Sequence, residues 1–362
     1  MKARYPRCHV TWVTRPEARA VLARNPAVDR ILTIDENYLE ILLVEEFDLA
    51  IGPEADQLSA SIMRMARASE FRGFIADGRG GVRAVGVAAA EWWQTSLDDE
   101  LKQRNRRTYG SWLYAVCALE GPVAAPVLSV TDTARARVAE RLAARAGEKR
   151  RYVCINTGAS GRWKEKRWKA AHYQQFARLI GEAEPNVVVV LVGGPNEVAL
   201  NRELLAAGIG FIDGGTANTM DEFGALVAAS EWVLTPDSLG YHVACATATP
   251  ALCLVGPTAP WELDLYGRNL VLYSDLSCIA CYRSECPFPR TCMDMLAPQA
   301  AWENLQVWWR AGGADYRPIA AEVSGVIPII GEDTPTSSAD IVEAPARELV
   351  QVRRRARSSH IQ

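Results

Sequence analysis

The segment TPDSLGYHVACATATP, residues 235–250, places a carboxylate and an imidazole where both could act on a ligand. Asp237 ends an apolar run, His242 follows five residues later, and small residues come next. The pattern predicts a strand followed by a helix that begins near Ser238. The first amides of such a helix lack partners within it and carry about +0.5 of an elementary charge, so they can hold a phosphate group; these are the amides of Ser238, Leu239 and Gly240. The alternative interpretation is a helix cap at Asp237 and a structural histidine at His242.

Three more predicted strands end in loops of similar chemistry. NTGASGRWKEKRW carries Ser160 and Lys166 in a small-residue, basic loop that can approach an anion closely. VGGPNEV places Glu197 where it can accept from ribose hydroxyls or stabilise a helix start, and LVGPTAP places Thr258 after the fourth strand. Because parallel strands end at a common edge, where open α/β sheets bind ligands, these loops together predict a nucleotide-diphosphate pocket.

The elements that position these loops alternate regularly from residue 151 onward. The short, apolar, β-branched character of buried strands is found in RYVCINTG, NVVVVLVGG, GFIDGG, EWVLTPD and PALCLVGPT, and helical stretches separate all five. Strands that alternate with helices of this length indicate βαβ units with right-handed crossovers. We therefore expect a Rossmann-like domain over residues 151–315.

The first half of the sequence has a weaker pattern of the same kind. HVTWV, RILTI, FDLAIGP and FRGFIA are expected strands of a second Rossmann-like domain over residues 1–126. KQRNRRTYGSWLYAVCALEG is expected to be one helix with Arg104, Arg106 and Arg107 at its start, either on a solvated face or in contact with an anionic acceptor. An Ala/Arg-rich helix links the domains over residues 127–150, and residues 316–362 are expected to be a mostly disordered tail.

Composition limits the class of protein. The 362 residues are 49% hydrophobic and 23% charged, which suits a soluble protein of two domains. A net charge of −3 gives no field that would recruit nucleic acid. No apolar run approaches the ~20 residues of a membrane span, and the N-terminus has no signal-peptide pattern, so we expect a cytoplasmic protein.

The nine cysteines fall into two sets. Five stand singly in apolar contexts and are expected to be small core residues: Cys8, Cys117, Cys154, Cys245 and Cys253. The other four are close together in CIACYRSECPFPRTC, separated by two, four and five residues: Cys278, Cys281, Cys286 and Cys292. In a cytoplasmic protein such a group favours a metal or redox site over disulfides. A structural zinc ion, an iron–sulfur cluster and a metal-free set of reduced thiols all remain open.

The order of these motifs resembles glycosyltransferase family 9, the ADP-heptose:lipopolysaccharide heptosyltransferases. The resemblance rests on GAS…KEKRW, VGGPNE, DGGTANTMDEFGALVAASEWVLTPDSLGYHVACA and LVGPTAPWELDLYG, and residues 1–35 also fit the family pattern. It implies a GT-B fold, two Rossmann-like domains facing a cleft, with the donor in the C-terminal domain and the acceptor in the N-terminal one.

The resemblance also implies roles for the candidate residues. Lys166 would neutralise the donor diphosphate, Glu197 would meet the nucleoside, and Asp237 and His242 would line the sugar and phosphates. Ser160 and Thr258 would border that site. The sequence has no Asp-x-Asp, the motif with which metal-dependent sugar transferases hold a divalent ion, so we expect inverting transfer without a metal.

The chain departs from the family pattern in three ways. The first strand and the Gly-Asp turn that carries the catalytic base are not found, because MKARYP resembles the end of the first helix; the catalytic residue is therefore unassigned. The N-terminal domain is expected to lack this central strand, leaving a gap or forcing its neighbours together. Gly240 lies one residue later than in relatives that transfer heptose, so the identity of the transferred sugar stays open. The C-terminal half also shows no residue pattern that would distinguish an ADP donor from a UDP donor.

The leading functional hypothesis is transfer of a heptose or related sugar, from ADP-heptose or another nucleotide-diphosphate donor, to a lipopolysaccharide core or other cell-envelope glycan. The acceptor implies a place at the inner membrane face. The alternatives are a catalytically inactive nucleotide-sugar-binding protein, motivated by the missing base, and a metal-binding structural module, motivated by the four clustered cysteines.

Overall fold

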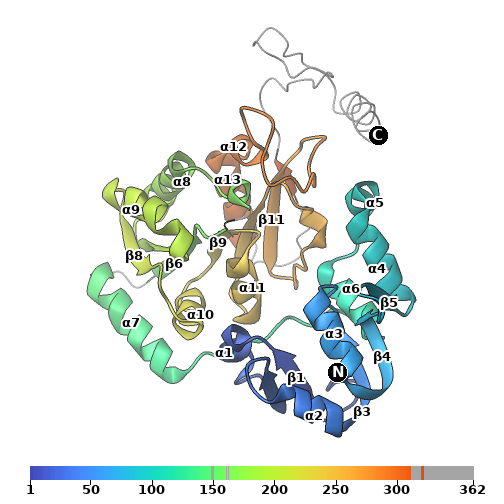
Figure 1. Cartoon of the computed structure of the whole chain (residues 1–362). Helices are drawn as coiled ribbons and strands as arrows, with labels where there is room; N and C mark the ends of the chain where they lie inside the picture. The colour runs from blue at the N-terminus through green and yellow to red at the C-terminus, as the bar shows by residue number, and fades with distance from the viewer. Residues whose placement is uncertain (148–150, 160, 162, 311–318, 322–362) are drawn as a thin grey trace.

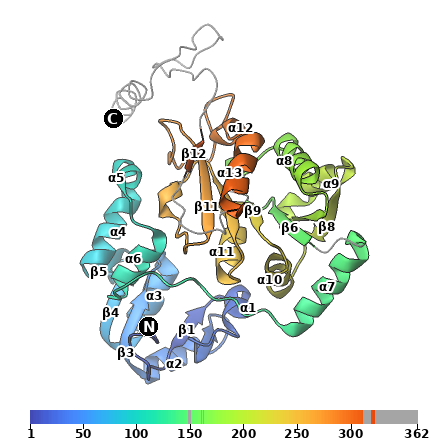
Figure 2. The same cartoon turned by 180° about the vertical axis from the view of Figure 1, so that it is seen from behind.

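The computed structural model describes residues 1–147, 151–159, 161, 163–310 and 319–321. Its two α/β halves lie side by side and are connected through helix α7 (Asp132–Ala146), as both views show (Figures 1 and 2). Most of the predicted tail, like Ser160, lies outside the described residues. Among those residues, no helix is long and apolar enough to cross a membrane.

The C-terminal half is built on a seven-stranded sheet whose neighbouring strands are all parallel. The strand order is β12-β11-β10-β9-β6-β7-β8. In chain order these strands are β6 (Arg151–Asn156), β7 (Val187–Val192), β8 (Phe211–Gly215), β9 (Val233–Pro236), β10 (Ala251–Val255), β11 (Asn269–Ser274) and β12 (Ile319–Ala321). The order reverses between β6 and β9, which makes this the topological switch point where such sheets bind ligands.

Helices cover both faces of this sheet. Alternate residues of each strand point to opposite faces, so Val153 and Ile155 join one core cluster and Cys154 joins the other. The first face is covered by α8 (Ala170–Ala183), α9 (Val198–Ala206) and α13 (Pro298–Arg310). The second is covered by α7, α10 (Met220–Ala228) and α11 (Leu239–Ala246). All six residues of β7 are buried, as predicted for a parallel strand with both faces covered.

The N-terminal half contains two smaller sheets. β1 (Thr11–Thr14) pairs with β2 (Arg30–Thr33), while β3 (Glu46–Gly52), β4 (Arg67–Ala76) and β5 (Val82–Val85) form a second sheet in which β5 is antiparallel. No backbone ladder joins the two sheets within the described residues. The helices of this half are α1 (Arg19–Leu22), α2 (Tyr38–Val44), α3 (Gln57–Met65), α4 (Val87–Leu97), α5 (Asp99–Arg104) and α6 (Tyr109–Val116).

The single helix expected from residue 102 onward is wrong: α5 ends at Arg104 and α6 begins at Tyr109. Asn105 interrupts the helix because its side-chain oxygen accepts from the Arg107 amide at 2.9 Å. Thr108 then caps α6 by accepting from the Ser111 amide at 3.1 Å. The three arginines therefore lie at the end of α5 and in the connection, and not at a helix start.

Those arginines have protein partners. Arg104 pairs with Glu100 at 2.9 Å, the Arg106 guanidinium lies 4.0 Å from the centroid of the Trp261 ring, and that of Arg107 lies 3.7 Å from Trp112. Stacking on an aromatic face is a favourable use of the planar guanidinium group. Arg106 and Arg107 are thus held against aromatic rings, whereas Arg104 forms an exposed ion pair on α5.

Candidate active site

Side chains from both sides of the switch point meet at the carboxyl edge of the large sheet. The Lys166 ammonium donates to Asp237 Oδ2 at 2.7 Å, and the Thr258 hydroxyl donates to the same oxygen at 2.7 Å. Lys166 lies in a 3₁₀ turn (Lys164–Lys166) in the loop after β6, Asp237 directly follows β9, and Thr258 follows β10. Three neighbouring strands thus deliver one hydrogen-bonded cluster, as the sequence predicted.

The start of α11 completes this cluster. Ser238 is its N-cap, and the Ser238 hydroxyl is 3.4 Å from the Gly240 amide. Leu239 opens the helix with its side chain 56% exposed, so it does not bury the helix start. The Gly240 amide already donates to Ser238, whereas the positive end of the helix dipole lies open beside the Lys166 ammonium.

Asn156, which the sequence analysis did not single out, holds α11 in place. Its amide nitrogen donates to Thr235 Oγ1 at 3.0 Å and to Ser238 Oγ at 3.2 Å, and the residue is buried. A Cβ at Gly240 would lie 2.3 Å from that same nitrogen. Gly240 is therefore required for the close approach of helix and strand end. The sequence signal that could have identified Asn156 is its position as a polar residue at the end of an otherwise apolar strand.

His242 lies one turn into α11. Its ring is accessible to solvent, yet protein surrounds it closely enough that desolvation lowers its pKa from 6.5, with Lys166 adding to the effect and the Asp237 carboxylate opposing it. His242 is thus near both charged members of the cluster, and its lowered pKa favours the neutral imidazole. It can offer a hydrogen bond to a ligand without adding a positive charge.

Glu197 lies at the neighbouring strand end but is held by other partners. Its side chain is 3% exposed; Oε1 accepts from Arg167 at 3.2 Å and Oε2 accepts from the Gly194 amide at 3.0 Å. The second bond forms a capping box at the turn after β7. Glu197 therefore stabilises the start of the helical segment, which is one of its two predicted roles. The contact of Glu197 with a nucleoside stays a prediction.

The two halves contact each other beside this site. The Asp264 carboxylate accepts from the Thr108 hydroxyl and from the Gly110 amide, the latter at 2.9 Å. Glu262 accepts from the Tyr282 hydroxyl at 2.6 Å and from the Asn105 amide group at 3.4 Å. Burial raises the pKa of Glu262. Tertiary contacts of this kind have no local sequence pattern, and the sequence analysis missed them.

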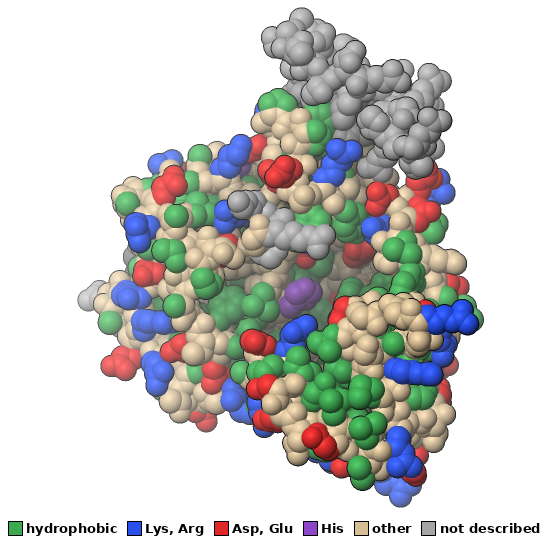
Figure 3. Space-filling model, viewed as in Figure 1, with side chains coloured by type: hydrophobic (Ala, Val, Ile, Leu, Met, Phe, Trp, Pro, Cys, Tyr) green, Lys and Arg blue, Asp and Glu red, His purple; other side chains and the backbone are tan. Residues whose placement is uncertain are grey.

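The molecular surface is hollowed between the two halves on the face shown in Figure 3. The recess is open to solvent and has hydrophobic and charged side chains around it. The recess lies between the two α/β halves, where the family resemblance implies a cleft.

The cysteines behave in three ways. Cys154, Cys245 and Cys253 are buried in the core as predicted, whereas Cys8 and Cys117 are only half-buried, because they lie at the less completely covered N-terminal half. The remaining four line one cavity (Cys278, Cys281, Cys286 and Cys292). Burial, and then the proximity of the other three thiols, raises the pKa of Cys292. No disulfide joins any of the nine within the described residues.

Comparison with known proteins identifies the family. The model of glycosyltransferase family 9 (heptosyltransferase) matches residues 39–291, more than half of the chain. Lipopolysaccharide heptosyltransferase 1 of Salmonella typhimurium is 27% identical over 105 residues, which are 29% of this chain and 32% of that protein. The match therefore spans about a third of this curated relative.

Solved structures agree on the fold. The ADP-heptose lipopolysaccharide heptosyltransferase II of E. coli aligns with 86% of this chain and 93% of its own, at a TM-score of 0.62 and 20% identity. A family 9 glycosyltransferase from Veillonella parvula aligns with 86% of this chain and 91% of its own, at a TM-score of 0.70 and 14% identity. The GT-B expectation is thereby confirmed. With the family model covering the switch-point cluster and the loops around it, the chain belongs to glycosyltransferase family 9.

Proposed function

We propose that this glycosyltransferase moves a heptose or related sugar from ADP-heptose to a lipopolysaccharide core or another cell-envelope glycan. The observation that carries the proposal is the cluster of Lys166, Asp237 and Thr258 beside the start of α11. The Salmonella and E. coli proteins to which the chain is similar are named as lipopolysaccharide heptosyltransferases, which supports the donor and acceptor classes. An inactive nucleotide-sugar-binding protein has no such support.

The leaving pyrophosphate is the group that this site suits best. As the bond between sugar and phosphate breaks, negative charge grows on the diphosphate. The Lys166 ammonium and the first amides of α11 are fixed donors that need little reorganisation to meet that charge. Ser160 and Thr258 border the diphosphate in this proposal, Glu197 meets the nucleoside, and Asp237 and His242 face the sugar and phosphates.

Transfer is proposed to invert the anomeric centre and to need no divalent metal at the diphosphate. A lysine and a helix start supply the positive charge for which other sugar transferases use a metal ion. The reaction also requires a base for the acceptor hydroxyl. We assign that role to no residue of this chain.

The division of labour between the halves is also proposed. Residues 151–315 bind the donor, residues 1–126 receive the acceptor, and residues 127–150 link them. Because lipopolysaccharide core is assembled on a lipid anchor, the enzyme would work from the cytoplasm at the inner membrane face, without a span of its own among the described helices.

The test is turnover of defined donors. The full chain is incubated with ADP-heptose, and separately with UDP-sugars, together with heptose-free lipopolysaccharide core, in buffer with and without added Mg²⁺ or Mn²⁺. We expect ADP release only with ADP-heptose, a product whose anomeric configuration is opposite to that of the donor, and the same rate with and without these added ions. Intact ADP-heptose after prolonged incubation would refute the proposed activity, while a retained anomer or a requirement for added Mg²⁺ or Mn²⁺ would refute the proposed mechanism.

A further inference from the structure

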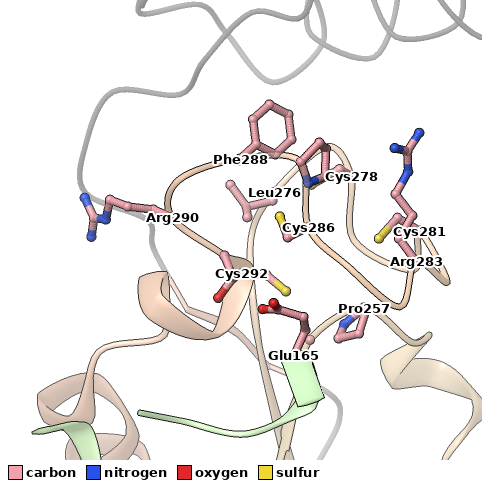
Figure 4. A pocket seen from close by; sticks show the side chains of 13 residues that line it. Glu165, Pro257, Leu276, Cys278, Cys281, Arg283, Cys286, Phe288, Arg290 and Cys292 are labelled. Carbon is pink, nitrogen blue, oxygen red and sulfur yellow. The ribbon is translucent and has the colours of Figure 1, made fainter. Parts of the chain in front are cut away.

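Four thiols and one carboxylate surround a cavity that the transfer reaction does not use. The cavity has a volume of about 40 Å³ and lies where the loop over residues 276–292 folds over the end of β10. Figure 4 shows the side chains of Cys278, Cys281, Cys286 and Cys292 around it, with the Glu165 carboxylate pointing toward Cys292 from below. Residues far apart in the chain, 165 and 276–292, therefore meet at one small space.

The ligand chemistry fits a soft divalent metal ion. Thiolates select zinc and iron, and four of them satisfy a tetrahedral ion at about 2.3 Å without any other donor. Within the described residues, no three Cys, His, Asp or Glu side chains are already placed closely enough to hold a metal ion together. Binding therefore has to draw the sulfurs inward and release their protons, which is the usual coupling of metal binding to local folding.

The charges around the cavity suit a metal centre held by four thiolates. Arg283 and Arg290 also line the cavity and extend outward from its rim (Figure 4). Their two positive charges balance the double negative charge of one divalent ion with four thiolates.

The backbone of the loop is already bent around Cys281. The residues on either side, Ala280 and Tyr282, have φ values of 60° and 51°. Residues with side chains rarely adopt this left-handed region, and they keep it only where the surrounding structure holds them there. Hydrogen bonds from Tyr282 to Pro257 and Glu262 already restrain one side of this bend, and a bound ion would restrain Cys281 itself by tying it to three other points of the loop.

The cavity is also connected to the donor site by covalent neighbours. Glu165 lines the cavity, and the next residue, Lys166, donates to Asp237. Gly256 and Pro257 line it as well, and Thr258 is hydrogen-bonded to Asp237. Order in this loop is therefore transmitted to two members of the donor cluster through one or two peptide units.

We propose that Cys278, Cys281, Cys286 and Cys292 bind one divalent transition-metal ion through their sulfurs, and that this ion holds the loops that carry Lys166 and Thr258 in position for the donor. The ion has a structural and positioning role and takes no part in the transfer. The metal site itself does not depend on the proposed function, whereas its effect on the donor does.

Metal content tests the first part. The full chain, freed of any affinity tag, is analysed for metals after expression in a medium with zinc and iron, and metal-depleted chain is titrated with Co²⁺. We expect one ion per chain and a cobalt spectrum with thiolate charge-transfer and tetrahedral bands. Cys281→Ser and Cys286→Ser should lose the ion, whereas Cys117→Ser, a half-buried cysteine far from the cavity, should retain it. Circular dichroism checks that each variant is folded.

ADP affinity tests the second part without any sugar transfer. Metal-depleted wild-type chain should bind ADP at least about 5-fold more weakly than zinc-loaded chain, the lower end of usual coupling between sites. Absence of stoichiometric metal, retention by both cysteine variants, or acid-labile sulfide in proportion to iron would overturn the single-ion site. Equal ADP affinity with and without the ion would overturn the positioning role.

Discussion

Replacement of Lys166 by methionine removes the positive charge of the donor cluster while keeping most of the side-chain length. The Lys166 ammonium is 2.7 Å from Asp237 Oδ2, and the two side chains are 12% and 17% exposed. A phosphate about 4 Å from this ammonium, at an effective dielectric constant of about 20, is attracted by ~4 kcal/mol. Solvent at the open side of the pair screens part of this attraction. We therefore expect Lys166→Met to weaken ADP binding by ~2–4 kcal/mol, or roughly 30- to 1000-fold in Kd.

The same substitution has a smaller effect on folding. In this variant the Asp237 carboxylate keeps the hydrogen bond from the Thr258 hydroxyl at 2.7 Å, so it still has a hydrogen-bond donor. We expect Lys166→Met to lower the free energy of unfolding by ~1–3 kcal/mol, between the values for exposed and fully buried ion pairs. Isothermal titration with ADP and urea unfolding measure the two effects separately.

Lys169→Met is the matched control. Lys169 lies three residues away and is 2.8 Å from the Asp294 carboxylate, but its side chain is 68% exposed. We expect unchanged ADP affinity and a loss of stability below about 1 kcal/mol. Wild-type ADP affinity in Lys166→Met, or an equal loss in Lys169→Met, would refute the assignment of Lys166 to the diphosphate.

Three further predictions use other parts of the site. Gly240→Ala should destabilise the fold by ~1–3 kcal/mol in urea unfolding, since its Cβ would lie 2.3 Å from Asn156 Nδ2. The control is Gly181→Ala in α8, where the added Cβ meets open space and should stabilise the fold by ~0.5–1 kcal/mol. Equal effects of the two substitutions would contradict this packing argument. NMR titration should find the pKa of His242 below 6.5 in the free protein, because desolvation lowers it. With ADP bound the pKa should be higher, because the phosphate charge favours the imidazolium. If the pKa does not rise on binding, ADP binds elsewhere. Burial raises the pKa of Glu262 above 4.5, so its contribution to stability is full below that pH and is lost as pH rises through the folded value. Glu262→Gln should therefore gain stability relative to wild type as pH rises above 4.5 in urea unfolding, and a difference that stays constant with pH would refute this reasoning.

The C-terminal half was largely predictable because its strands are buried on both faces. Continuous apolar runs such as Val187–Val192 mark strands without ambiguity, and the loops that follow them carry the polar residues of the cluster. The resemblance to family 9, which the family model confirms, rests on the same loops. Here local sequence and tertiary position agree, since each strand end needs only its own loop to reach the common edge.

Prediction failed where the alternation of strand and helix breaks. β11 (Asn269–Ser274) was missed because no helix connects it to β10; the connection contains a 3₁₀ turn, Pro260–Glu262. The break between α5 and α6 was missed because Asn105 and Thr108 redirect hydrogen bonds locally within a helix-favouring context. The contacts of Asp264 and Glu262 depend on a neighbouring half that no local pattern describes.

The segment from Gly256 to Asp264 explains why these features are coupled. Its first residues line the thiol cavity, Thr258 donates to Asp237, and Glu262 and Asp264 hold the connection between α5 and α6. Nine consecutive residues thus touch the proposed metal site, the donor cluster and the opposite half. A change that loosens this segment should alter donor affinity and the contact between the halves together. In the loop after β7, Glu197 is held by Arg167 and Gly194 of its own half, so a change there should affect the donor alone.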